Sequence, residues 1–419
     1  MRRNFLSKVL AASLIMIISI SIVACSSSTK PTIAHDRNGK WRNDITYLEE
    51  QLPKKHKNLF FKLKEEDFYR DMDELKNKVN DYSDEEIKVQ LSKIIASIGD
   101  GHTMVYPNIE TIYPLKLYWF KEGIYVVDAS EEYKNTINLK LDKINGKNVS
   151  EVLELLKPII SHENSPQFKN LAVRYLIMPE ILKGLNIINE DEVNMIFLDG
   201  KGKEIKVDIK PDKIENIEYI GKMVEDNSNP LYLRNPYINY WYEYIEEDNT
   251  LYFQYNSCSD MEEKPFKEFA KEMFDFIDNN KVDKLVIDLR NNGGGNSTIM
   301  NPFFKELKKR EELNDKDKLY VVVGRKTFSS AILNALTFKN KTQATFIGEP
   351  TGGKPNHYGE VKELYLDNTG ITVSYSVKYF KNSKDDTDSL MPDINVEPSI
   401  IDYINKEDAV IEKILSDKH

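Results

Sequence analysis

The chain has 419 residues and a formal net charge of −10 at pH 7, because 68 acidic residues outnumber 58 lysines and arginines. A net negative charge repels a phosphate backbone, so we expect no nucleic-acid partner. The 2 cysteines and 6 histidines are scattered without the spacing of zinc ligands, so we expect neither a structural metal nor a cofactor.

The N-terminal segment has the pattern of a signal peptide. Basic residues precede an apolar run over residues 9–23, which is short for a membrane-spanning helix and is followed by a polar stretch. Cys25 ends the segment IVAC, which resembles the lipidated cysteine of bacterial lipoproteins. We therefore expect residues 1–24 to be removed and residues 25–35 to form a lipid-anchored linker. The mature protein would then lie outside the cytoplasm, on a membrane surface.

Residues 36–103 predict a helical module. Apolar residues recur at three- and four-residue steps between Phe68 and Val79, as on one face of a helix. Ser83, with Glu86 three positions later, has the pattern of an N-cap with a capping box. A second helix is therefore expected to begin directly after Ser83.

Residues 104–211 contain short apolar runs separated by turns, which predicts a β-rich module. The stretch LDKINGKNVSEVLELL resembles the central part of a PDZ domain, and this resemblance implies binding of an extended peptide by strand addition. A β-rich spacer that only packs is the alternative. Residues 212–250 are rich in Asn, Tyr and Pro and predict a connection to the last module.

Residues 251–419 predict an α/β module. The runs KLVIDL, LYVVV and ATFIG are continuous apolar strands separated by helical segments, which indicates a parallel sheet buried on both faces. Ligands collect at the carboxyl ends of the strands in such sheets. The segments NNGGG and KTFSS follow two of these strands, so we expect them to carry functional residues.

Four segments resemble motifs of known peptidases: DLRNNGGG at residues 288–295, TFS at 327–329, GEPTGGK at 348–354 and GDGHT at 99–103. The first three resemble the tail-specific, or C-terminal processing, serine peptidase family. The fourth resembles the related tricorn-type branch. The resemblance implies serine-peptidase activity and a crotonase-like, ClpP-like last module built of ββα repeats.

The resemblance implies that Ser329 is the nucleophile. A serine at the N-terminus of a helix lies near unpaired N–H groups and the positive end of the helix dipole, which favour a developing negative charge. We expect the N–H groups of Gly294 or Gly295 and of Ser330 to hold the oxyanion. Ser330 also carries a hydroxyl, so the choice of nucleophile between the two serines stays open.

Two residues are candidates for the general base, because His102 matches the tricorn-type motif and Lys354 the processing-protease motif. A histidine titrates near neutral pH, whereas a lysine needs a pKa lowered by about three units. We therefore favour His102. The tricorn-type pattern implies that Asp386 or Asp388, before the segment PDI, orients the histidine. A solvated acidic loop is the alternative for these two residues.

The sequence thus predicts a lipid-anchored, extracytoplasmic serine endopeptidase that cleaves extended polypeptides through an acyl-enzyme on Ser329. The alternative is a catalytically inactive protein that binds a peptide or a hydrophobic ligand on the same fold, since fold alone does not establish activity. The sequence specifies no oligomeric state.

Overall fold

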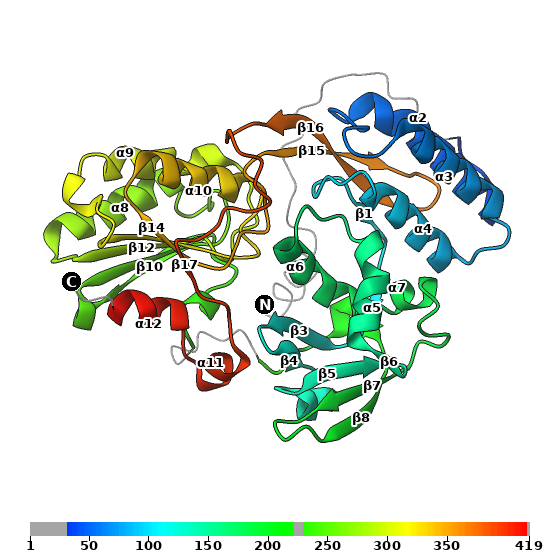
Figure 1. The fold of residues 1–419 in the computed structure, drawn as a ribbon, viewed down its shortest axis with the longest axis horizontal. Helices are drawn as coiled ribbons and strands as arrows, with labels where there is room; N and C mark the ends of the chain where they lie inside the picture. Colours follow the sequence, from blue (N-terminus) through cyan, green and yellow to red (C-terminus); the bar gives the residue numbers. More distant parts are fainter. Residues whose placement is uncertain (1–31, 222–228, 417–419) are drawn as a thin grey trace.

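The computed structural model describes residues 32–221 and 229–416 and has a mixed α/β fold. The expected signal peptide and Cys25 lie outside the described residues. Figure 1 shows a layered α/β body, in yellow and green, on one side of the molecule. On the other side, a helical body in blue lies beside a second sheet in cyan and green. Within the two described ranges, no helix combines the length and the apolar character that a membrane span requires.

Three helices form the N-terminal body: α2 (Arg37–Lys55), α3 (Glu65–Lys78) and α4 (Asp84–Ala96). The predicted capping box is confirmed at the start of α4. The Glu86 N–H donates to Ser83 Oγ at 3.2 Å, and the Ser83 N–H donates to Glu86 Oε2 at 2.9 Å. Helix α4 ends at Ala96, and the GDGHT segment follows at residues 99–103. The position of this segment is therefore set by the end of the helix.

An antiparallel sheet forms the middle body. Its strands are β3 (Leu115–Phe120), β4 (Gly123–Ala129), β5 (Lys140–Ile144), β6 (Lys147–Asn148), β7 (Val193–Leu198) and β8 (Glu204–Ile209). They pair in the order β3–β4–β5–β7–β8, with β6 beside β5. The helices on this sheet are α5 (Val149–Leu156), α6 (Ser165–Tyr175) and α7 (Pro179–Gly184). A separate short pair joins β2 (Thr111–Ile112) to β9 (Asp212–Lys213).

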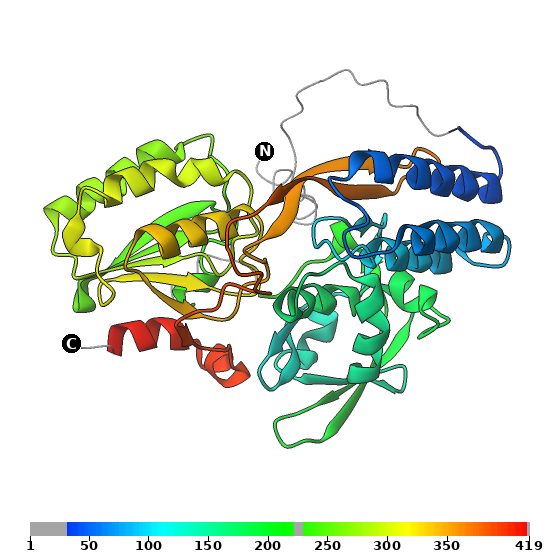
Figure 2. The same cartoon turned by 45° about the horizontal axis from the view of Figure 1, so that its top comes forward.

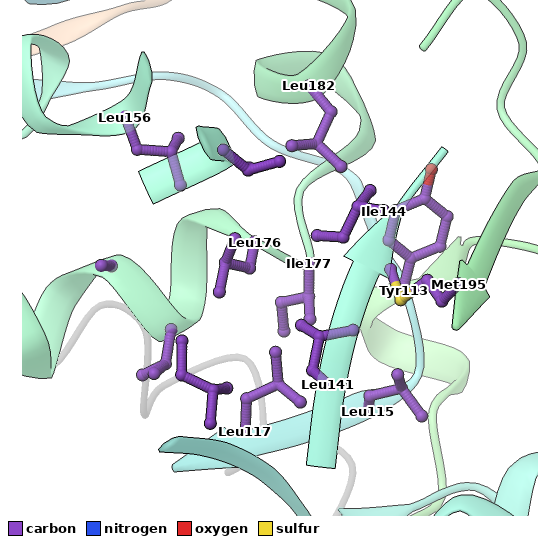
Figure 3. Packing of buried hydrophobic residues seen from close by; sticks show 14 of the residues in the cluster. Tyr113, Leu115, Leu117, Leu141, Ile144, Leu156, Leu176, Ile177, Leu182 and Met195 are labelled. Carbon is purple, nitrogen blue, oxygen red and sulfur yellow. The ribbon is translucent and has the colours of Figure 1, made fainter. Parts of the chain in front are cut away.

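The core of the middle body is apolar. Leu115 and Met195 from the sheet belong to one buried cluster with Leu156 and Leu176 from the helical layer (Figure 3). Burying such side chains contributes about 25 cal/mol for each Å² of apolar surface removed from water. Because α6 is part of this core, the loop before it, which carries Glu163, is fixed relative to the sheet.

The C-terminal body contains the predicted parallel sheet. Its strands, in pairing order, are β10 (Tyr240–Ile245), β11 (Thr250–Tyr255), β12 (Lys284–Asp288), β13 (Leu319–Val323), β14 (Thr345–Gly348) and β17 (Ile394–Asn395). Only the β10–β11 pair of this sheet is antiparallel within the described residues, and the other pairs are parallel. Every residue of β11 and β13 is buried, and the apolar run LYVVV predicted this for β13.

Helices cover both faces of this sheet (Figure 1). The helices on one face are α8 (Phe266–Asn279), α9 (Asn301–Leu307) and α10 (Ser330–Lys341). Helix α12 (Ala409–Ser416) packs on the other face, after the short helix α11 (Ile400–Asn405). Helix α10 follows β13 directly, so the serines at its start lie at the carboxyl end of the sheet.

A long hairpin connects the C-terminal body to the N-terminal helices. Its strands are β15 (His357–Tyr365) and β16 (Thr372–Phe380), and β16 also pairs with β1 (Val105–Tyr106). The hairpin residues Leu364, Val373 and Tyr375 share one buried cluster with side chains of α2–α4. Residues 251–419, expected to form the peptidase core module, thus include a hairpin whose apolar side is buried in the helical body. Figure 2 shows the hairpin crossing from one body to the other.

A buried ion-pair network ties the DLR segment to the last helix. Arg290 Nε donates to Asp288 Oδ2 at 2.7 Å, and its two terminal nitrogens donate to Asp408 at 3.0 and 2.9 Å. Tyr252 also donates its hydroxyl to Asp288 Oδ2, at 2.7 Å. Asp408 in turn accepts from the Val410 N–H in the first turn of α12. The arginine of this motif thus has a structural role between the sheet and α12.

We expect Arg290→Met to destabilise the protein by about 3–5 kcal/mol, because it leaves the fully buried Asp288 without its cation. The free energy of unfolding in urea, followed by circular dichroism, measures the change. The control is Lys271→Met, which removes an exposed pair with Asp275 within α8 and should leave the unfolding midpoint unchanged. An Arg290→Met protein as stable as wild type would contradict this role.

Candidate active site

Ser329 is the N-cap of α10 and has an unusual backbone conformation. Its φ is 52° and its ψ is −126°. A non-glycine residue in such a region costs about 1–3 kcal/mol, so neighbouring contacts must hold it. The Phe328 N–H donates to the Asn292 carbonyl at 3.1 Å, and the Gly353 N–H donates to the Thr327 carbonyl at 3.0 Å. The two loops that carry the DLRNNGGG and GEPTGGK motifs therefore hold the turn that presents Ser329.

The glycine turn lies directly against Ser329. Gly294 has a φ of 111°, and a Cβ atom there would lie 2.7 Å from the Ser329 Cβ. Gly295 has a φ of 128°, and a Cβ atom there would lie 2.5 Å from the Cys258 carbonyl oxygen. Both the backbone conformation and the space exclude a side chain. The turn therefore needs glycine at these two positions to approach the serine.

The hydrogen bonds of this turn show which of its N–H and hydroxyl groups are already engaged and which are not. The Gly294 N–H donates to Asn292 Oδ1 at 2.8 Å, so it is already engaged. The N–H groups of Gly295 and Ser330 have no hydrogen-bond acceptor among residues 32–221 and 229–416. The Ser330 hydroxyl donates to the Gly295 carbonyl at 2.5 Å, whereas the Ser329 hydroxyl has no partner in the same ranges. The structure thus leaves one hydroxyl and two N–H groups available at one place.

His102 lies beside this serine turn, in the loop after α4. Its ring stacks on the ring of Phe328, the residue before Ser329, with centroids 4.2 Å apart and planes at 22°. The His357 ring stacks near it, at 5.6 Å. The His102 side chain is buried, and neither ring nitrogen has a hydrogen-bond partner within the described chain. Burial lowers the pKa of His102 to about 4, against the opposing effect of Asp100.

Asp100 places a carboxylate beside the His102 ring, with its Oδ1 3.9 Å from Nδ1. Three side chains donate to its Oδ2: His56 Nε2 at 3.1 Å, Thr103 Oγ1 at 2.6 Å and Ser376 Oγ at 2.6 Å. Burial acts to raise the pKa of Asp100, but the His56 hydrogen bond and the other donors lower it to about 2. Asp100 is therefore ionised at neutral pH.

Lys354 lies in a different environment from His102. Its Nζ is 3.1 Å from Asp388 Oδ1 and 3.7 Å from Asp386 Oδ1. Although burial acts to lower it, the hydrogen bond to Asp388 and the charge of Asp386 raise the pKa of Lys354 above its ordinary value. The structure thus pairs both expected orienting aspartates with the lysine, and neither is hydrogen-bonded or ion-paired to His102 among the described residues.

A second carboxyl group, Glu163, reaches the same place from the loop before α6. The Lys354 N–H donates to its Oε2 at 3.3 Å. Burial, together with the nearby Asp100, raises the pKa of Glu163 to about 8. One ligand atom from each of Asp100, His102 and Glu163 lies within 4.8 Å of the others, so these residues have the proximity needed to hold a metal ion.

Sequence reasoning missed both of these carboxyl groups. Asp100 stands two positions before His102 inside the GDGHT segment, so its proximity to the ring was available as a signal. Glu163 carries no sequence motif that we can identify, and only packing brings it to the site.

Comparisons with known proteins give one family match and several similar solved structures. Residues 249–311 match the model of peptidase family S41. The structure of mature CPAF complexed with lactacystin is similar over 90% of this chain and 97% of that chain, with a TM-score of 0.65 and 15% identity. Mature CPAF alone is similar over 90% and 96%, with a TM-score of 0.63 and 16% identity. No protein of curated function matches the chain in sequence.

A weaker likeness, with a TM-score of 0.42 and 12% identity, extends to the photosystem II D1 C-terminal processing protease. At identities this low, the likeness to CPAF shows a shared fold. Together with the family match, it identifies the chain as a serine-type peptidase. The matched residues 249–311 are similar to family S41, the tail-specific or C-terminal processing peptidases, and peptidases of this kind act on polypeptides.

We expect Gly294→Ala to destabilise the protein by about 1–3 kcal/mol, because alanine is strained at a φ of 111° and its Cβ would displace Ser329. A displacement of this kind also predicts a loss of about 100-fold in the rate at which a fluorophosphonate modifies Ser329. The control is Gly293→Ala, since a Cβ atom at Gly293 would have no neighbour within 4 Å. Equal rates for the two variants would argue against a tight fit at Gly294.

Proposed function

We propose that the chain is an endopeptidase that cleaves extended polypeptides through an acyl-enzyme on Ser329, with His102 as the general base. The observation that carries this proposal is the buried, unpartnered His102 ring stacked on Phe328, beside a serine whose hydroxyl is also unpartnered. A base and a nucleophile without competing partners are free to bond to each other and to substrate. The engaged hydroxyl of Ser330 supports Ser329 as the nucleophile.

The proposed reaction has two steps. Ser329 Oγ attacks the carbonyl carbon of the scissile peptide bond while His102 takes the hydroxyl proton. The C–N bond then breaks as His102 gives this proton to the leaving amine, which leaves an ester on Ser329. In the second step, a water molecule gives a proton to His102 and attacks the ester, and the proton returns to Ser329 Oγ as the carboxylic acid leaves.

The N–H groups of Gly295 and Ser330 are the proposed oxyanion donors. Both lack acceptors in the described residues, and that of Ser330 lies at the N-terminus of α10, where the helix dipole favours negative charge. Gly294 was the alternative donor, and its bond to Asn292 makes it the weaker candidate. Asp100, which faces Nδ1, is the proposed orienter of His102 in place of Asp386 or Asp388.

Lys354 is proposed to position its loop, because a lysine paired with two aspartates holds its proton. The crotonase-like character of the C-terminal body is supported by its parallel sheet with alternating helices. The PDZ-like character of the middle body, with peptide binding at a strand edge, rests on the sequence resemblance.

The cellular setting is also a proposal. The apolar run and Cys25 support a cleaved signal peptide and a lipid anchor, which would hold the peptidase on the outer face of a membrane. Peptidases in this position meet extended or unfolded polypeptides outside the cytoplasm.

We expect a fluorophosphonate to label wild-type protein at Ser329, as located by mass spectrometry. Ser329→Ala should abolish labelling, and His102→Ala should slow it by about 100-fold or more, because the hydroxyl loses its base. Lys354→Met should label within about tenfold of wild type. Cleavage of an unfolded polypeptide should follow the same order. A folded wild-type protein that never labels would instead favour the inactive binding protein.

The pH dependence of labelling tests the base separately. The ring of His102 accepts a proton only when it is neutral, and with a pKa of about 4 it is neutral at higher pH. The labelling rate should therefore rise through about pH 4 and stay constant from about pH 5 to 7. A rate that rises only near pH 10 would identify Lys354 as the base, since its pKa is raised. A labelling rate that rises with a midpoint at about pH 6.5 would instead indicate that the base is a histidine exposed to solvent.

A further inference from the structure

We propose that Asp100, His102 and Glu163 form an inhibitory zinc site at the peptidase centre. One ligand atom from each of these three residues lies within 4.8 Å of the other two, and no shift of the backbone is needed to bring them together. The His102 side chain is 5% exposed, and both of its ring nitrogens lack hydrogen-bond partners. A buried polar group without a partner is uncommon and calls for a ligand that satisfies it.

Neighbouring groups hold the ligands of this site in place. Oδ2 of Asp100 accepts hydrogen bonds from His56, Thr103 and Ser376, so the carboxylate is fixed with Oδ1 toward His102. Such outer partners orient the ligands of metal sites. Glu163 packs closely over the same loop, since a Cβ atom at Gly101 would lie 2.9 Å from its Cγ.

The donor set favours zinc. One imidazole nitrogen and two carboxylate oxygens are ligands that Zn²⁺ accepts with bonds of about 2.0–2.2 Å, often with a fourth position open to water. Magnesium prefers oxygen ligands in octahedral geometry and retains its water, so it suits this set poorly. Zinc would bind Glu163 in place of its proton, and the charge of the ion would offset the charges of the two carboxylates.

Zinc at this site would stop the reaction proposed above, and this part of the inference rests on that proposed function. A neutral imidazole has one acceptor nitrogen, and its other nitrogen carries a proton. A metal ion bound to the acceptor nitrogen removes the lone pair that would take the Ser329 proton. His102 therefore cannot be a zinc ligand and a general base at the same time, whichever nitrogen binds the metal.

Binding is tested first on Ser329→Ala protein, so that the result does not depend on catalysis. Titration calorimetry with ZnCl₂ should show one site per chain. His102→Ala and Glu163→Gln, each made in that background, should bind zinc at least about tenfold more weakly. The control His35→Ala removes an exposed histidine outside the site and should bind like the parent. Parent and His102→Ala proteins that bind zinc equally, or a parent that binds none, would overturn the site.

Inhibition is tested on the wild-type protein with the fluorophosphonate. The labelling rate at Ser329 should fall at least about tenfold at saturating ZnCl₂, recover when a chelator is added, and be unaffected by MgCl₂. Zinc that binds without slowing the labelling would overturn the inhibitory role. A protein that never labels, even with the chelator, contradicts the proposed function instead, and the calorimetric result on the Ser329→Ala protein still decides the zinc site.

Discussion

The burial of the β15–β16 hairpin among the N-terminal helices is the constraint on which the candidate active site depends. Ser329 belongs to the C-terminal body and His102 to the loop after α4, so the two residues are carried by bodies with separate hydrophobic cores. The hairpin holds the loop that carries His102, because Ser374 Oγ donates to the His102 carbonyl at 2.8 Å and Ser376 Oγ donates to Asp100. Its first residue, His357, stacks on the His102 ring. Val373 and Tyr375 alternate with Ser374 and Ser376 along β16, so the apolar burial of this strand also fixes the two serines against the His102 loop.

The two candidate bases, His102 and Lys354, differ in protonation because their surroundings differ. His102 is enclosed by Phe328 and His357, and burial without hydrogen bonds keeps its ring neutral. Lys354 meets two aspartates in a more open place, and these hold its positive charge. Both side chains lose water on folding, but only the lysine gains opposite charges strong enough to outweigh that loss. The surroundings of each side chain therefore decide which of the two motif residues is free to accept a proton.

The features that suit His102 to accept a proton also suit it to bind a metal ion. Both roles need a neutral ring with an available lone pair and a carboxylate held nearby. The hydrogen bonds on Asp100 Oδ2 supply the second condition and leave Oδ1 facing the ring. A peptidase centre of this construction is open to control by zinc without a separate regulatory site. Protons and metal ions would compete for the same nitrogen.

Sequence by itself determined the features that depend on local spacing. Apolar runs predicted the parallel sheet, the Ser83–Glu86 spacing predicted the start of α4, and the glycine turn was placed after its strand. Tertiary structure alone decided which groups meet at the site. It joined Ser374 to His102, 272 positions away, paired Lys354 with Asp388, and brought Glu163 beside Asp100. Local patterns record the preferences of neighbouring residues, whereas contacts between distant segments follow from how whole bodies bury their apolar surfaces.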